Sequence, residues 1–238
     1  MEIQLTRHPP WVETFLERIA PSVDRIVDGP LFSEMAAGCL SMARFRYGLL
    51  NCYPLIEDFP AYMGRAIQKV PGGREPRNDM ARNWLMVNIS IERMRTIWYR
   101  QWAVDFGVPE AAFDSRIVPP PEVDALNNYL WRVVDQGSLA ECIAAVNFAV
   151  EGPSGEWTKR VKPNIRAYAD RDGVRFTRGT TMWINAHARY DDKHTPEALE
   201  IMKAFATTEQ EQERVMLAAR RSMDYYAMAA DACYHMAD

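Results

Sequence analysis

The sequence has few cysteines, and it lacks any apolar run long enough to cross a bilayer. Four cysteines stand far apart in 238 residues, without a CxxC pair: Cys39, Cys52, Cys142 and Cys233. This spacing does not resemble a disulfide framework or a zinc ribbon, so we expect reduced thiols. A membrane span needs about 20 consecutive apolar residues. The first residues also lack the profile of a signal peptide. We therefore expect a cytoplasmic protein that does not bind a membrane.

Common catalytic and phosphate-binding motifs are missing as well. The chain has no GxSxG, no Walker phosphate loop and no GxGxxG, which disfavours several large enzyme classes. A net charge of −4 argues against a nucleic-acid partner. A chain of this length buries enough surface to form one core without disulfides. We therefore predict a single domain over residues 1–238.

Apolar residues recur at spacings of three and four through most of the chain, and alternation with a period of two is almost absent. This pattern predicts an all-α protein. Gly152-Pro153-Ser154-Gly155 and Thr195-Pro196 predict helix breaks, and residues 174–177 allow a short extended stretch. We expect helices at about residues 10–28, 31–69 with a break near 51–54, 79–107, 122–135, 138–151, 156–170, 180–194, from 196, and from 207 or 208 to 236.

The segment HARYDDKH places two histidines and an aspartate on one side of an expected helix. His187, Asp191 and His194 stand at i, i+4 and i+7, so they fall within roughly 60° of one another. Imidazole with carboxylate suits iron, manganese or zinc. On spacing alone, an ordinary solvated helix face explains this charged segment equally well.

Glu92 and Glu151 are carboxylates that stand among apolar neighbours, where their helices should face the core. A buried carboxylate is costly unless it is paired or bound to a metal. An arginine or lysine partner is the structural alternative for each. The two remaining histidines, His8 and His235, lie near the termini, so any metal site should be rich in carboxylates.

Three stretches, NDMARNWLMVNISIERMRTIW, NFAVEGPSGEW and HARYDDKHTPEALEI, resemble the haem-oxygenase-like di-iron oxidases. The resemblance extends from about Leu31 into the C-terminal helix, over its Ser222 to Tyr226 stretch, and three motifs in the right order are more specific than one. It implies a haem-oxygenase-like helical bundle in which Glu92, Glu151, His187, Asp191 and His194 bind two Fe(II) ions. It also implies that O2 is the co-substrate.

Within this family, the chain resembles members that form nitriles from brominated tryptophan and members that form terminal alkenes from medium-chain fatty acids. The resemblance implies oxidative fragmentation of a small carboxylate substrate, an amino acid or a fatty acid, with loss of the carboxyl carbon. Nitrile formation in a biosynthetic pathway is the favoured version. A homodimer is a further expectation.

Arg95 departs from the alkene-forming members, which have a metal-binding histidine three residues after the first glutamate. Arginine stays protonated and cannot bind a metal, so a donor atom of the substrate could fill that position. Arg95 could pair with Glu92 one turn away, which is the favoured interpretation, or bind the substrate carboxylate.

Two rival hypotheses need no iron. The first is a metal-free relative of the thiamin-salvage or quinone-cofactor enzymes, which share the helical fold. The second is a non-catalytic helical interaction module whose polar face only looks like a site. The metal content of the protein separates both from the di-iron hypothesis.

Overall fold

The computed structural model describes residues 3–235, except for the side chains of residues 190–192. Within that part of the chain every regular element is helical and no strand occurs, so the predicted all-α class is confirmed. The α-helices are α1 (Pro10–Val27), α2 (Pro30–Ala37), α3 (Met42–Asn51), α4 (Tyr53–Ala66), α5 (Pro76–Asp105), α6 (Pro121–Gln136), α7 (Leu139–Ile143), α8 (Ala149–Val161), α9 (Met182–Phe205) and α10 (Glu209–His235). Shorter elements are the 3-10 helices η1 (Ile67–Lys69), η2 (Glu110–Phe113) and η4 (Lys162–Tyr168), and the π-helical segment η3 (Ala144–Phe148).

Local sequence signals set many of the helix ends. Ser138 caps α7 through a reciprocal pair of hydrogen bonds with Glu141, which satisfies two backbone N–H groups that would otherwise lack partners. Proline occupies the first turn of α1, α2, α4, α5 and α6, where a missing N–H costs nothing. Gly107 follows α5 with a φ of 90°, a conformation that favours glycine at a helix end.

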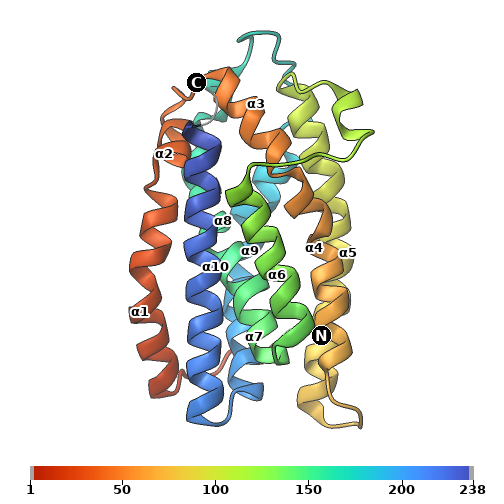
Figure 1. Ribbon diagram of the computed structural model, residues 1–238, viewed down its shortest axis with the longest axis vertical. Coiled ribbons are helices and arrows are strands. Elements are labelled where there is room, and N and C mark those ends of the chain that lie inside the picture. Colours follow the sequence, from red (N-terminus) through yellow and green to blue (C-terminus); the bar gives the residue numbers. More distant parts are fainter. Residues whose placement is uncertain (1–2, 236–238) are drawn as a thin grey trace.

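The long helices run side by side along the long axis of the molecule (Figure 1). Helix α10 packs against α1 and α6, α4 packs against α5, and α9 contacts both α5 and α8. In the view of Figure 1, α8 and α9 lie behind α10 and α6. The site residues on α5, α8 and α9 are thus brought together inside the bundle.

Two predicted helix breaks are wrong. Pro153 lies inside α8 and Pro196 lies inside α9, and both helices continue past them. At Gly152, an added Cβ would lie at an ordinary van der Waals distance of 3.6 Å from Thr195 on α9, so the two helices are in contact here. This tertiary packing outweighs the local preference of glycine and proline for a turn. A break between α2 and α3, near Gly38, was not predicted, although Gly38 adopts a φ of 69°.

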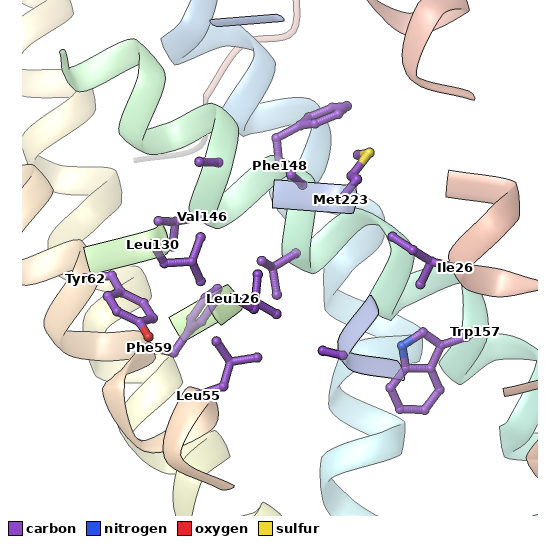
Figure 2. Packing of buried hydrophobic residues seen from close by; sticks show 14 of the residues in the cluster. Ile26, Leu55, Phe59, Tyr62, Leu126, Leu130, Val146, Phe148, Trp157 and Met223 are labelled. Carbon is purple, nitrogen blue, oxygen red and sulfur yellow. The ribbon is translucent and has the colours of Figure 1, made fainter. Parts of the chain in front are cut away.

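The apolar core is continuous through the bundle. Figure 2 shows Phe59 and Tyr62 of α4 close to Leu126 and Leu130 of α6, and Trp157 of α8 on the other side of the view. All five side chains are buried, and burying each one stabilises the fold by roughly 1.5–3 kcal/mol. No helix among the described residues is long and apolar enough to span a membrane.

Candidate functional site

Three helices each contribute a buried polar residue to one place in the bundle. Glu92 lies in the middle of α5, Glu151 near the start of α8, and His194 in the middle of α9. Their exposed fractions are 5%, 2% and 6%. One ligand atom from each of the three lies within 4.8 Å of the other two. Buried acidic and imidazole groups this close together are typical of metal sites and of buried ion pairs.

Arg95 lies between the two carboxylates. Its Nη1 is 2.7 Å from Oε1 of Glu92 and 3.4 Å from Oε2 of Glu151. The arginine is fully buried, so the two ion pairs are shielded from solvent. The structure thus shows the pairing that the sequence favoured, extended to a second glutamate. The guanidinium supplies one positive charge where two negative charges meet.

Two further polar side chains contact Glu151. His194 Nδ1 is 2.9 Å from its Oε2, and Asn147 Nδ2 donates to its Oε1 at 2.8 Å. We call Glu92, Arg95, Asn147, Glu151 and His194 the Glu151 cluster. Asn147 was missed by the sequence analysis. Its position four residues before Glu151 in an otherwise apolar run was the signal available.

Asn147 belongs to the π-helical segment η3, which leads directly into α8. A π-helical turn widens the helix, and such turns are frequent at functional sites. Ser222 of α10 donates to the carbonyl oxygen of Ala145 in this segment at 2.7 Å. The irregular turn is therefore stabilised from a neighbouring helix, and it places Asn147 beside Glu151.

The surroundings favour an ionised Glu151 and, outside the Glu151 cluster, a neutral His187. Burial opposes ionisation of Glu151, but the hydrogen bond with His194, the charge of His194 and the charge of Arg95 outweigh it and lower the pKa of the carboxyl. Burial, followed by the charge of Arg95, holds the pKa of His187 well below its ordinary value of 6.5. A neutral imidazole keeps a lone pair free for a metal.

His187 lies outside the Glu151 cluster but lines the same cavity as Glu92 and Glu151. Its Nδ1 is 2.9 Å from the carbonyl oxygen of Trp183, and the two rings lie with centroids 3.7 Å apart. The Nδ1 atom therefore serves as the hydrogen-bond donor, which leaves Nε2 as the free acceptor. Trp183, four residues before His187 on α9, thus orients the imidazole.

The cavity beside the cluster is apolar and rich in aromatic rings. Trp183 stacks on Trp102 and on Trp157, with centroid distances of 5.3 and 5.7 Å, and Phe32 stacks on Trp157 at 4.5 Å. The cavity has a volume of about 90 Å³, counted as the space open to the centres of water-sized molecules. Its lining suits a small apolar group.

Tyr226 adds a polar group to the cavity wall, besides the carboxylates and the imidazole. Its hydroxyl accepts a hydrogen bond from the indole N–H of Trp157 at 2.9 Å and lies 3.0 Å from the hydroxyl of Ser154. Both Tyr226 and Ser154 line the cavity together with Glu151. A ligand in the cavity would therefore meet carboxylates and imidazole at one end and hydroxyl groups elsewhere.

The donor set fits a metal ion. Glu92, Glu151 and His194 offer two carboxylates and one imidazole at a mutual spacing suited to a single ion, and His187 lines the adjoining cavity. An ion bound there would compete with Arg95 for the same carboxylate oxygens. Asp191, the remaining predicted ligand, belongs to α9, but its side chain lies outside the described residues.

A further buried carboxylate, Asp105, lies at the end of α5 away from the Glu151 cluster. Its Oδ2 accepts hydrogen bonds from the hydroxyls of Thr177 at 2.6 Å and Thr180 at 2.5 Å. Its Oδ1 accepts one from the side-chain amide of Gln101 at 2.8 Å. We call these four residues the Asp105 cluster. It fastens the loop before α9 to the end of α5.

The fold and site together define a class, namely helical bundles with a buried carboxylate and imidazole centre beside an apolar cavity. The family model for iron-containing redox enzymes matches residues 46–227. The chain therefore belongs to this family of iron-containing redox enzymes, with a haem-oxygenase-like fold, as the resemblance implied. Among curated proteins, none matches the chain.

Several solved structures are similar over nearly the whole chain. A TenA homologue from Pseudomonas syringae pv. tomato is 31% identical, with a TM-score of 0.86 and coverage of 98% of this chain and 99% of that one. A domain of unknown function with a haem-oxygenase-like fold from Shewanella denitrificans is 17% identical, with a TM-score of 0.75 and coverages of 94% and 92%. A putative TenA-like thiaminase from Sulfolobus solfataricus is 15% identical, with a TM-score of 0.62 and coverages of 93% and 95%.

Proposed function

We propose that this protein is an O2-dependent non-haem iron oxidase that binds two Fe(II) ions through Glu92, Glu151, His187, Asp191 and His194. The observation that carries the proposal is the buried group of Glu92, Glu151 and His194 on three different helices. The match to iron-containing redox enzymes supports iron over other metals. Bound iron would supply electrons for the reduction of O2.

The protein's own residues prepare this site in three ways. Arg95 contacts both glutamates, and its charge favours the ionised form of Glu151 despite burial. Asn147 fixes one oxygen of Glu151, which leaves fewer orientations for the other. The aromatic wall around Trp183 makes the cavity largely apolar, which strengthens electrostatic interactions inside it.

For the substrate, we propose a carboxylate-bearing molecule that is fragmented with loss of its carboxyl carbon. The stacked rings of Trp102, Trp157 and Trp183 favour an aromatic group in the cavity. Nitrile formation from a tryptophan-like amino acid is therefore the preferred version. Formation of a terminal alkene from a medium-chain fatty acid is the alternative.

A metal-free enzyme of the thiamin-salvage type is the second candidate. Two observations favour it: similarity to proteins named TenA homologues and the position of Arg95. Because the guanidinium already contacts both glutamates, the negative charges of the cluster have a partner without any metal. The two candidates thus differ in whether metal ions bind to the Glu151 cluster in addition to the Arg95 guanidinium.

Anaerobic titration with Fe(II) tests the proposal. We expect close to two irons per chain once substrate is present, and about one fewer in His194→Ala, because that substitution removes a ligand. His235→Ala, at the exposed end of α10, is the matched control and should bind iron like the wild type. Full binding by His194→Ala would refute the assigned ligand set, and absence of binding in the wild type would favour the metal-free enzyme.

The same titration separates the two substrate classes. If an amino acid donates an atom to the iron that lacks a protein ligand, tryptophan and its halogenated forms should tighten the weaker iron site, since ligands that bind the same state reinforce one another. Lauric acid should leave it unchanged. The opposite result would replace nitrile formation by alkene formation.

A further inference from the structure

Two cysteines that are distant in the sequence meet in the wall of the cavity. Cys52 lies at the junction of α3 and α4, and Cys233 lies near the end of α10. Their sulfur atoms are 3.8 Å apart, which is ordinary contact between two thiols. Gly48, one turn before Cys52, has no side chain, and a Cβ added there would lie 3.8 Å from Cβ of Cys233. This is an ordinary van der Waals distance, so α3 and α10 are in contact at this point.

The two thiols differ in their access to small molecules. Cys52 is half-buried and lines the cavity, whereas Cys233 is fully buried behind it. A molecule that enters the cavity therefore reaches Cys52 first. Cys233 is positioned to react only with Cys52.

Neither of the other two cysteines has this arrangement. The thiol of Cys142 donates to the carbonyl oxygen of Val133 at 3.5 Å, and burial raises its pKa to about 12. The thiol of Cys39 is exposed and donates to the carbonyl oxygen of Glu34 at 3.6 Å. The chain thus contains internal controls for a buried thiol and for an exposed one.

We propose that Cys52 and Cys233 form a redox-active dithiol, a modification site in the cavity wall that a peroxide converts reversibly to a disulfide. The site is separate from the proposed iron ligands, and the inference does not depend on the proposed function.

The reaction balances with hydrogen peroxide as the oxidant. The thiolate of Cys52 attacks one peroxide oxygen, the O–O bond breaks, and after proton transfer one water leaves while Cys52 becomes a sulfenic acid. The sulfur of Cys233 then attacks the sulfur of Cys52, the S–O bond breaks, and a second water leaves. Two thiols are oxidised to one disulfide, and the peroxide is reduced to two waters.

The hydrogen bond between the thiols supports these roles. It lowers the pKa of Cys52, against the opposing effect of burial, and it raises the pKa of Cys233 well above its ordinary value. Cys52 lines the cavity, so it is the sulfur that a peroxide reaches and that attacks it as the thiolate. Cys233 remains a thiol until the sulfenic acid has formed beside it.

The test is to treat the full chain with graded hydrogen peroxide, alkylate the remaining thiols and map disulfides by peptide mass spectrometry. We expect a link between Cys52 and Cys233 within one chain, together with a higher melting temperature that dithiothreitol reverses. A sample treated with a metal chelator should give the same link. Formation only in the sample that retains metal would overturn the proposal, since the oxidation would then be metal-driven damage.

Single variants separate the two thiols. In Cys233→Ser, oxidation should stop at a sulfenic acid on Cys52 that a 1,3-dione reagent traps, and Cys52→Ser should slow the oxidation of Cys233 at least tenfold. Cys39→Ser and Cys142→Ser should leave the link unchanged. Should a variant fail to fold, the mapping in the wild type decides. Oxidation of Cys39 before any link forms, or links only between chains, would refute the proposal.

Discussion

The Glu151 cluster and the Asp105 cluster solve the same problem, the burial of carboxylates, in opposite ways. Asp105 receives its hydrogen bonds from two threonine hydroxyls and one amide. These neutral donors come from the end of α5 and the loop before α9, and they satisfy both oxygens. Glu92 and Glu151 instead share a guanidinium and an imidazole beside a cavity. The Asp105 cluster fixes a loop, whereas the Glu151 cluster leaves negative charge where a ligand or metal can reach it.

The comparison shows that burial of a carboxylate does not by itself indicate function. What distinguishes the two places is the kind of partner and the neighbouring space. The hydrogen bonds from neutral donors satisfy the Asp105 carboxylate, so nothing favours replacing these donors by a ligand or a metal. A cation that contacts two carboxylates can be replaced by another cation, and the adjoining cavity provides a way in. The predictions below test this division, from the largest effect to the smallest.

Glu151→Gln should have the largest effect. The amide keeps the shape of the side chain but removes the charge that a metal needs, so catalytic activity should fall by about three orders of magnitude or more, as for loss of a central electrostatic group. The far-UV circular dichroism spectrum should remain that of the folded protein. Glu156→Gln, an exposed position on the same helix, is the matched control. Normal turnover by Glu151→Gln would remove this residue from the site.

Asp105→Ala should act on stability and not on iron. The substitution leaves two threonine hydroxyls and the Gln101 amide without their buried acceptor, so we expect a loss of about 2–4 kcal/mol in the free energy of unfolding. Iron stoichiometry should stay at the wild-type value. Asp114→Ala, which removes an exposed partner of Arg100, should cost less than about 0.5 kcal/mol. Urea unfolding measures both, and a loss of iron in Asp105→Ala would contradict the division.

Arg95→His should raise iron affinity in the absence of substrate by about tenfold, the lower end of the range for changes next to a metal site. The substitution removes the cation that contacts Glu92 and Glu151 and adds an imidazole. Amino-acid binding should weaken at the same time, because the open position is filled. Arg93→His, exposed on the same helix, serves as the control in a calorimetric titration. Unchanged or weaker iron binding would show that Arg95 does not compete with the metal.

The smallest effect concerns pH. The pKa of His187 is depressed in the folded protein, so below its ordinary value of 6.5 the unfolded chain binds a proton that the folded chain does not. Stability should be full above pH 6.5 and fall as the pH drops below it, by at most about 1.4 kcal/mol per pH unit. His187→Phe should flatten this slope in metal-free protein. Curves from urea unfolding that stay parallel for the two proteins would contradict the prediction.

The sequence predicted the arrangement of the site better than its surroundings. Glu92 and Glu151 were identified because carboxylates among apolar neighbours have few explanations, and His194 because of its helical spacing from His187 and Asp191. The three lie together in the structure. The pairing of Arg95 with Glu92 followed from helix spacing, whereas its contact with Glu151 needed the tertiary structure. Binding of metal by these residues, by His187 and by Asp191 stays a prediction, as does the single domain over residues 1–238.

The errors have a common physical origin. Gly152 and Pro153 predicted a turn because local preferences were weighed without the neighbouring helix, yet α8 continues through both residues and contacts Thr195 of α9. The meeting of Cys52 and Cys233 is equally invisible in the sequence, since 181 residues separate them. Contacts between distant segments decide such cases, and no local pattern encodes them.

The π-helical segment η3 makes the site depend on a residue count. It spans Ala144–Phe148 and ends three positions before Glu151. A π-helical turn absorbs one extra residue, so deleting one residue there would restore an ordinary α-helical turn and leave the helices on both sides in phase. Glu151 would keep its direction, but Asn147 lies inside the segment and would lose its place beside Glu151. A relative that lacks the extra residue could therefore retain Glu151 and His194 without the hydrogen bond that Asn147 donates to Glu151 in this protein.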